Sequence, residues 1–530
     1  MNYTHSVLSC SESKAWESSL FEGNEEKEWA AMQQAGKALA QAILKDFHEI
    51  RPLPQNLKVL VLAGKGHNTG DAFIAVEEIF KHCLAPQIII FPVEERGSMK
   101  PNTKRALACI ENHDGVKFLP SASTLETQEA MLLELTKAGN TIGFHICLDG
   151  LIGMQFTAPL REPVKSLIEV VNKYEAIDFR AAIDLPSGIG DQSDKGAFQA
   201  DFTYATGIFK APLAEFENRS KAGRVRYLNL EMLKMDEVDT KAHSESILLE
   251  EVIKPLKKLR PALCDKRSFG HLAILSGSKR MPGAMLMSVK AALRSGVGLV
   301  TAMAPASVAH QLAFAVPEAM WVPLPETKDG SISVQSRNLI QEHLSSATAF
   351  LSGPGLGSGP ESRSLLIQLI SHVNMPIVLD ADALYPEVIK ASWARSDSKN
   401  PLVITPHLGE YRRLTNNPEN LGATKDLLDY CRKNRLVSVL KGSPTKICNG
   451  SDTTMSPFGG PVLARGGSGD ILSGIVGGIL AKGSTDSFKS ICKAVAWHGL
   501  AADMLAQEHG QISIETTMLL DYLQKVLRGS

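Results

Sequence analysis

Residues 463–474, with the sequence LARGGSGDILSG, join a cluster of glycines, one carboxylate and the start of a helix without a gap. The glycines let the backbone turn tightly, so the N–H groups of Ser468, Gly469 and Asp470 are expected to point outward at the helix N-terminus. Backbone N–H groups in that position bind anions. The stretch therefore predicts a phosphate site at the start of a helix.

The helix itself is predicted from apolar residues that recur at the spacing of one helical face before Gly483 ends the run. Asp470 then falls in the first turn, beside the anion site. A carboxylate there can act as general base toward a hydroxyl held near a transferable phosphoryl group. It can also merely cap and charge the first turn, and both interpretations stay open. The apolar residues are Ile471, Leu472, Ile475, Ile479 and Leu480.

Short apolar runs that end at glycine, proline or aspartate alternate with longer helical patterns along most of the chain. This alternation is typical of a parallel sheet with helices on both faces. Ligands bind at the carboxyl ends of strands in such sheets. The fold class predicted is therefore α/β, with two three-layer αβα domains. The runs cover residues 58–64, 87–93, 144–150 and 181–188 in the first half, and 271–278, 298–305, 349–357, 376–384, 401–407 and 438–443 in the second.

The length of the chain requires more than one domain, because 530 residues exceed what one hydrophobic core covers. Residues 233–246 are polar and charged and show no apolar period. We place the boundary inside this segment, which gives domains 1–240 and 241–530. Ahead of the first strand, residues 26–47 carry apolar side chains at helical spacing and predict a helix packed over the first sheet.

The composition is that of an ordinary globular protein, with 44% hydrophobic and 21% charged residues. The formal net charge is -1, and the sequence contains no block of basic residues and no acidic tail. We therefore expect neither nucleic acid nor a membrane as partner. The eight cysteines form no CxxC pair and indicate reduced thiols in a cytoplasmic protein. The first residues lack the pattern of a signal peptide, and no apolar run approaches the roughly 20 residues that span a bilayer.

Three motifs follow strands in the first half of the chain. GKGHNTGDAF (64–73) leaves a strand and enters a helix, so a phosphate-bearing ligand could approach its backbone. Its glycines miss the GxGxxG dinucleotide spacing by one residue, although Glu94 could still imitate the ribose-binding acid of such a unit. DGLIGMQFTAP (149–159) and DLPSG (184–188) follow two later strands.

Together these motifs resemble the NAD(P)H-hydrate epimerase domain, whose loops read GxGNNGGDG, DxxxGTG and DxPSG, over residues 26–230. The resemblance implies a Rossmann-like domain with Asp184 as a catalytic residue. It also implies K⁺ bound by Asn68, Asp149 and Ser187, whose oxygen atoms suit a hard cation. The substrate contacts that it implies are His67, Asn68, Thr69, Gly70, Asp71, Gly153, Met154, Gln155, Phe156, Thr157, Ala158 and Pro159.

This half departs from the family pattern at several positions. His67 replaces an asparagine, Thr69 and Ala72 replace glycines, and residues 154–155 replace Thr-Gly. We expect the added Cβ atoms at positions 69 and 72 to keep the ligand away from the backbone. Two alternatives stay open: in one, Asp149 and Asp184 only cap loops by accepting backbone N–H groups, and in the other the domain binds its ligand without catalysing a reaction.

Five motifs occur in order in the second half: SGPGLG (352–357), DADAL (380–384), TPHLGEYRRL (405–414), LKGSPT (440–445) and finally LARGGSGD (463–470). The ordered set resembles the ADP-dependent NAD(P)H-hydrate dehydratase of the ribokinase-like family, over residues 250–525. The resemblance implies that the C-terminal domain is ribokinase-like. An ordered set of five motifs is far more specific than any of its members.

The resemblance implies contacts to the hydrated substrate from Ala284, Gly357, His407 and Asp470, with Asp470 as the base. The implied nucleotide-binding residues are Lys441, Gly442, Ser443, Pro444, Thr445, Gly467, Ser468 and Gly469. Read from the residues alone, His407 can be an ordinary loop histidine and Lys441 a solvated lysine. Asp380 and Asp382 can orient Mg²⁺ or satisfy turn amides.

The function predicted is the repair of hydrated NADH and NADPH (NADHX and NADPHX). The first domain interconverts the R and S hydrates, and the second dehydrates the S hydrate with ADP as phosphoryl donor, releasing NAD(P)H, AMP and phosphate. The implied cofactors are K⁺ in the N-terminal domain and Mg²⁺ in the C-terminal domain, and a homo-oligomer is compatible with the sequence. The alternative is a vitamin or sugar kinase of the same fold, with the first half a non-catalytic binding module.

Overall fold

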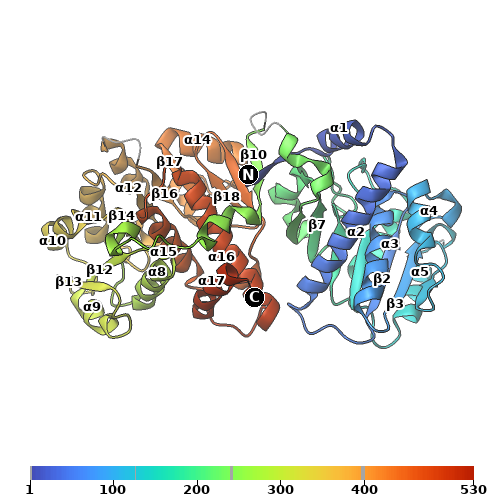
Figure 1. Cartoon of the computed structure of the whole chain (residues 1–530), viewed down its shortest axis with the longest axis horizontal. Helices are drawn as coiled ribbons and strands as arrows, with labels where there is room; N and C mark the ends of the chain where they lie inside the picture. The colour runs from blue at the N-terminus through green and yellow to red at the C-terminus, as the bar shows by residue number, and fades with distance from the viewer. Residues whose placement is uncertain (1–2, 126, 239–242, 396–399, 530) are drawn as a thin grey trace. The chain divides into compact units, whose positions relative to one another are not determined.

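The computed structural model describes residues 3–125, 127–238, 243–395 and 400–529. The chain forms two compact units, Thr4–His243 and Ser244–Ser530, and Tyr3 belongs with the second. Figure 1 draws the first unit in blue to green and the second in green to red. The boundary predicted between residues 240 and 241 lies outside the described residues.

The N-terminal unit is built on a seven-stranded parallel sheet in the order β4-β3-β2-β5-β6-β7-β9. The chain runs outward from β2 to β3 and then returns to β5 on the other side of β2, so the loops after β2 and β5 flank the point where the strand order reverses. The strands are β2 (Lys58–Ala63), β3 (Gln87–Pro92), β4 (Val116–Phe118), β5 (Ile146–Gly150), β6 (Arg180–Ile183), β7 (Phe202–Thr206) and β9 (Arg224–Leu228).

Helices cover both faces of this sheet. Alternate residues of β2 enter two separate apolar clusters: Val59 and Val61 pack with α2 and α3, whereas Leu60 and Leu62 pack with α5 and α6. The predicted helix over residues 26–47 is α2, and a short parallel pair, β1 with β8, lies outside the main sheet. The remaining elements of this unit are α1 (Cys10–Phe21), α2 (Glu25–Phe47), α3 (His67–His82), α4 (Pro101–Ala108), α5 (Gln128–Gly139), α6 (Val164–Lys173), α7 (Arg219–Ala222), β1 (Thr4–Leu8) and β8 (Phe209–Lys210).

In the C-terminal unit ten strands follow the order β13-β12-β11-β14-β15-β16-β17-β18-β19-β10. All of the pairings are parallel except those of β18, which runs antiparallel to both neighbours. The strands are β10 (Glu245–Leu248), β11 (His271–Leu275), β12 (Leu299–Pro305), β13 (Met320–Leu324), β14 (Ala349–Ser352), β15 (Ile377–Leu379), β16 (Leu402–Ile404), β17 (Leu436–Leu440), β18 (Thr445–Cys448) and β19 (Thr453–Ser456).

This sheet is also covered on both faces, because Leu272 and Ile274 of β11 pack into one apolar cluster and Ala273 and Leu275 into another. One face carries α8 (Pro282–Arg294), α15 (Ser468–Ala481), α16 (Ser487–His509) and α17 (Leu519–Arg528). The other carries α10 (Arg337–Leu344), α11 (Pro360–Ile370), α12 (Pro386–Ala391), α13 (Leu408–Thr415) and α14 (Thr424–Asn434). A further helix, α9 (Ala306–Ala313), links β12 to β13.

The predicted α/β class with two three-layer domains is confirmed, and all ten predicted strands coincide with parallel strands of the two sheets. The polar hairpin β18–β19 was missed because its strands, TKIC and TTMS, lack an apolar run. Among the described residues no helix combines the length and apolarity needed to cross a membrane. All eight cysteines are free thiols.

Candidate active sites

The N-terminus of α15 forms the centre of the first candidate site. Gly467 precedes the helix with φ +93°, and a Cβ at that position would collide with the sulfur of Met287. Gly469 faces the site, since a Cβ added to it would lie 3.2 Å from Lys441 Nζ. The prediction that the Ser468 N–H points outward is wrong. This N–H donates to the Arg465 carbonyl at 3.4 Å, within the turn that precedes the helix.

Asp470 lies in the first turn of α15 and its carboxylate accepts no hydrogen bond from the described residues. Burial raises the pKa of Asp470 to about 6, the negative charge of Asp380 adds to the rise, and Lys441 opposes it. A group that served as a helix cap would accept a backbone N–H, and such acceptance lowers a carboxyl pKa. The arrangement is that of a base close to neutral pH rather than that of a cap.

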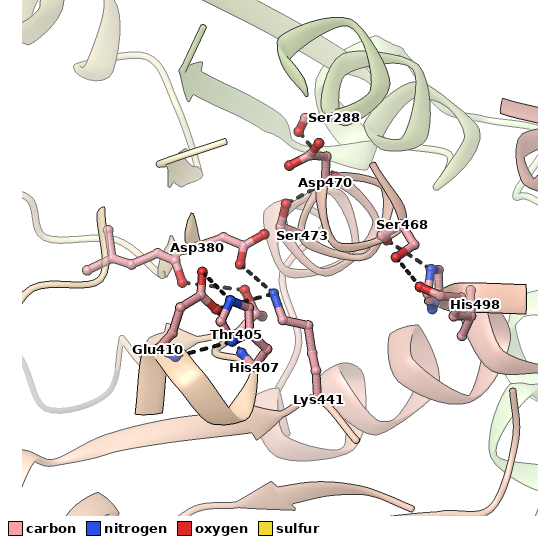
Figure 2. Close-up of polar contacts among 12 residues, drawn as sticks. Ser288, Asp380, Thr405, His407, Glu410, Lys441, Ser468, Asp470, Ser473 and His498 are labelled. Carbon is pink, nitrogen blue, oxygen red and sulfur yellow. Dashed lines mark hydrogen bonds and ion pairs between the residues drawn. The ribbon is translucent and has the colours of Figure 1, made fainter. Parts of the chain in front are cut away.

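Lys441 is held in an ion-paired network rather than solvated (Figure 2). Its Nζ lies 3.0 Å from Asp380 Oδ1 and 3.7 Å from Glu410 Oε2, and its side chain is 23% exposed. Burial disfavours its charge, but the carboxylates of Asp380, Glu410 and Asp470 outweigh that effect and raise the pKa of Lys441. The site thus keeps a permanent cation beside Asp470.

His407 stands at the rim of the same site. It is the N-cap of α13, where its Nδ1 accepts the Glu410 N–H at 3.2 Å and the Glu410 carboxylate accepts the His407 N–H at 2.7 Å. Its side chain is 60% exposed, and its backbone pairs with Lys441 in a parallel bridge. The capping role and a contact to a ligand are therefore compatible, because most of the ring is exposed, although its Nε2 lies 3.6 Å from Glu410 Oε1.

The loop after β14 brings two further predicted residues together. Gly357, with φ +87°, donates its N–H to Asp382 Oδ2 at 2.9 Å, so Asp382 satisfies a turn amide. Gly355 lies against Ala284, since a Cβ added there would be 2.9 Å from the Ala284 Cβ. The buried hydroxyl of Ser278 beside this loop has no hydrogen-bond partner among the described residues. Asp382 in turn acts on the pKa of Asp470, which links this loop to the α15 site.

One contributor to this site has no sequence signal. His498 in the middle of α16 is buried, and its Nε2 lies 3.1 Å from the Ser468 carbonyl (Figure 2). Burial lowers the pKa of His498 to about 4, so the ring is neutral and donates its Nε2–H to that carbonyl. The bond orients the peptide that carries the Gly469 N–H. Three of the remaining nucleotide-site predictions, Gly442, Ser443 and Pro444, lie in the loop between β17 and β18, and the fourth, Thr445, begins β18.

The N-terminal unit contains a cavity of about 860 Å³ that most of the predicted residues line. The first turns of α3 contribute His67, Asn68 and Asp71. The segment after β5 contributes Gly153, Met154, Gln155, Phe156, Thr157 and Pro159, and Glu94 and Asp184 complete the predicted set. Lys210, Thr206 and Glu17 also line it and were not predicted.

Asp184 enters the cavity from a left-handed backbone conformation with φ +64°. Its Oδ1 accepts hydrogen bonds from Lys210 Nζ and, at 3.2 Å, from Thr206 Oγ1. Lys210 is 1% exposed and also donates to the Thr206 carbonyl at 3.3 Å. Asp184 therefore bonds side chains rather than the backbone N–H groups of the capping alternative. The pair holds a charged carboxylate at the cavity wall.

The predicted K⁺ ligands lie in one cluster. Asp149 is fully buried and accepts the Ser187 N–H at 2.7 Å, the Ser187 hydroxyl at 2.6 Å and the Leu151 N–H at 3.3 Å. Burial raises the pKa of Asp149 to about 6 despite these bonds. The amide nitrogen of Asn68 is buried without a hydrogen-bond partner among the described residues. Asp149 thus does satisfy backbone amides, and the cluster still offers oxygen atoms that fit a hard cation.

Four predictions for the first loop and the segment after β5 are not supported. Thr69 is fully buried and points inward, where its hydroxyl accepts the Gly64 N–H at 2.8 Å and donates to the Gly150 carbonyl at 2.7 Å. Ala72 is likewise fully buried. The expectation that these two Cβ atoms block the ligand is therefore wrong. Among the described residues, Thr69, Gly70 and Ala158 do not line the cavity.

Comparison with known proteins finds related sequences along almost the whole chain. A family model of NAD(P)H-hydrate dehydratase matches residues 272–525, and a model of the YjeF-related protein N-terminus matches residues 29–211. The bifunctional NAD(P)H-hydrate repair enzyme of Moorella thermoacetica is 29% identical, over 94% of this chain and 92% of the relative. That of Gloeobacter violaceus is 30% identical, over 92% of each.

Among solved structures, the ADP/ATP-dependent NAD(P)H-hydrate dehydratase of Bacillus subtilis, crystallized with ATP and Mg²⁺, is similar to the C-terminal half. It is 27% identical with a TM-score of 0.45, and the match covers 53% of this chain and 96% of that one.

Proposed function

Because this chain belongs to the family of bifunctional NAD(P)H-hydrate repair enzymes, we propose that Asp470 is the base of its ADP-dependent dehydratase and Asp184 a catalytic residue of its epimerase. The predicted family is thereby confirmed, whereas the roles of individual residues are our proposal. One observation carries it best: a carboxylate with a pKa of about 6 stands in the first turn of a glycine-led helix, close to an ion-paired, half-buried lysine.

In the dehydratase reaction Asp470 removes the proton from the hydroxyl group of the hydrate. At the same time the hydroxyl oxygen forms a bond to the β-phosphorus of ADP. The bond from that phosphorus to the AMP oxygen breaks, and AMP leaves. Lys441 and the N–H groups of Gly469 and Asp470 stabilise the charge on the migrating phosphoryl group. The ring carbon–oxygen bond of the phosphate ester then breaks, and phosphate leaves with the electron pair of that bond. The neighbouring ring carbon loses a proton, and the electron pair of its C–H bond forms the double bond of NAD(P)H.

Mg²⁺ would act here mainly through the nucleotide. The described residues contain no group of three or more histidine, cysteine or acidic side chains arranged to hold a metal. Mg²⁺ commonly binds through phosphates, water and one or two carboxylates, which Asp380 and Asp382 can supply. Bound Mg²⁺ would neutralise charge on the phosphates.

We propose that K⁺ binds in the N-terminal unit at Asn68, Asp149 and Ser187. There it would compensate the negative charge of the buried Asp149 carboxylate.

The test of the dehydratase supplies the hydrate of NADH with ADP and then with ATP and follows the absorbance of the restored dihydronicotinamide. Recovery that requires nucleotide is the expected result. No recovery with either nucleotide would overturn the proposal and favour the small-molecule kinase.

The N-terminal unit is proposed to interconvert the R and S hydrates in its cavity, next to Asp184 and Lys210. This is tested with the full chain and purified R hydrate: chromatography follows its conversion to the S hydrate with and without K⁺, in the absence of nucleotide. Exchange no faster than the spontaneous rate would favour a non-catalytic binding module.

A further inference from the structure

The first helix of the chain is fixed against the epimerase cavity. Strand β1 pairs in parallel with β8 so that Leu8 lies opposite Lys210, and α1 begins two residues later. The N–H groups of Cys10 and Ser11 donate to the carboxylate of Asp191 at 2.7 and 3.0 Å. The start of α1 is therefore held beside the lysine that pairs with the catalytic aspartate.

One face of α1 lines the cavity. Its members Lys14, Glu17, Ser18 and Phe21 follow the spacing i, i+3, i+4 and i+7 of a single helical face. Trp16, on the neighbouring face, packs into an apolar cluster and donates its indole N–H to the Leu233 carbonyl at 2.9 Å. This packing fixes the rotation of the helix about its axis, so Glu17 lines the same cavity as Asp184.

The surroundings of Glu17 favour its protonated form. The pKa of Glu17 is raised to about 7, mainly by burial; Lys210 opposes the rise, and the negative charges of Asp184 and Glu28 contribute to it. Asp184 is instead hydrogen-bonded by Lys210 and Thr206. Burial also raises the pKa of the neighbouring Asp71 well above its usual range. A carboxyl group with a raised pKa in one cavity with a carboxylate that is bound by a lysine is an arrangement that acid–base catalysis can use.

We propose that Glu17 is a second catalytic residue of the epimerase and exchanges protons with the substrate together with Asp184. The inference rests on the proposed epimerase function of the cavity. It concerns a residue that precedes the matched part of the family model, which begins at residue 29.

The chemistry balances with these two groups. The hydroxyl of the hydrate sits on a ring carbon bonded to the ring nitrogen. Glu17 donates a proton to that hydroxyl, the C–O bond breaks and water leaves, while the nitrogen lone pair forms a C=N bond. Water then adds to the opposite face and gives its proton to Asp184. The exchange in the other direction uses the two groups with their roles reversed, and solvent restores their protons between turnovers.

The experiment compares Glu17→Gln with a matched control, Glu22→Gln, in the full chain. Glu22 lies just after α1 and is exposed, outside the cavity lining. The R hydrate is supplied with ADP, so its recovery as NADH requires epimerisation first; the S hydrate is measured separately. We expect Glu17→Gln to slow R-hydrate turnover by a factor of about 10² or more, with S-hydrate turnover unchanged. Glu22→Gln should match the unmodified chain in both.

A pH profile separates catalysis from a structural role. The rate of R-hydrate exchange should show an inflection near pH 7, from the pKa of Glu17 at about 7, and Glu17→Gln should lose it. Glu17→Asp should keep the inflection and part of the rate, which a misfolded cavity would not. Unchanged exchange in Glu17→Gln, or an inflection that persists in it, would overturn the inference while leaving the epimerase function intact. If the unmodified chain exchanges the R and S hydrates no faster than the spontaneous reaction in solution, the proposed epimerase function itself is overturned.

Discussion

At the scale of single residues, Asp470 and Lys441 show how burial decides chemistry. Both side chains are partly buried in one network of charged groups. The pKa of Asp470 rises because burial and the negative charge of Asp380 disfavour its ionised form. The pKa of Lys441 rises because the surrounding carboxylates favour its charged form. At neutral pH Asp470 is thus a carboxylate that still binds a proton readily, and Lys441 stays charged. A base and a phosphate-binding cation can therefore act at the same moment.

Replacement of Asp470 removes the proposed base but not the proposed anion site. Asp470→Asn should lower the kcat of dehydration by a factor of about 10² or more, the scale of a positioned base. Nucleotide affinity, measured by calorimetry, should change little, because the N–H groups of α15 and Lys441 remain. The exposed Asp429→Asn on α14 serves as the control. An unchanged kcat in Asp470→Asn would assign this carboxylate to helix stability.

The pH dependence of dehydration follows from the raised pKa of Asp470. The base must be ionised, so activity should rise as pH increases through about 6, where Asp470 titrates, and level off above it. The quantity to measure is kcat/KM for the S hydrate between pH 5 and 8, a range of about three units around this pKa. In Asp470→Asn the residual activity should lack that rise. A rise that persists in the variant would identify a different base.

At the scale of elements, the start of α15 depends on the turn before it. Gly467 needs a positive φ, and a Cβ there would meet the sulfur of Met287, whereas Gly466 has open space around its Cβ position. Gly467→Ala should lower the free energy of unfolding by about 1–2 kcal/mol, the cost of a left-handed conformation for a residue with a Cβ. It should also weaken nucleotide binding.

Gly466→Ala is the matched control for that change. Denaturant unfolding and calorimetry with ADP give the two readouts, and we expect this neighbour to leave both nearly as they are. Equal effects of the two substitutions would mean that the turn tolerates a side chain and that the anion site does not depend on it.

At the scale of the whole molecule, each unit has its own sheet, its own apolar clusters and its own set of acidic and basic residues. The two reactions should therefore be separable by mutation within one chain. Asp184→Asn should abolish the exchange of R and S hydrates but leave dehydration of the S hydrate at its original rate. Asp470→Asn should do the reverse.

Chromatography of the two epimers measures the first activity, and dihydronicotinamide absorbance measures the second. Loss of both activities from either substitution would show that the units depend on each other for catalysis.

The amino-acid sequence by itself determined the features that are local. Ten strands could be predicted because buried parallel strands are short, continuous apolar runs, and α15 because a glycine turn, Asp470 and an apolar face follow each other within a few residues. The roles assigned to Asp470 and Asp184 came from ordered motifs, each complete within about a dozen residues.

The tertiary structure alone decided which distant side chains meet. Lys210 reaches Asp184, and Glu17 enters the same cavity, because β1 pairs with β8; His498 supports Ser468 from another helix. No local pattern encodes these contacts, since they depend on strand pairing and helix packing. The direction of a side chain is also decided there: Thr69 turns inward because its hydroxyl satisfies the backbone of two neighbouring strand ends.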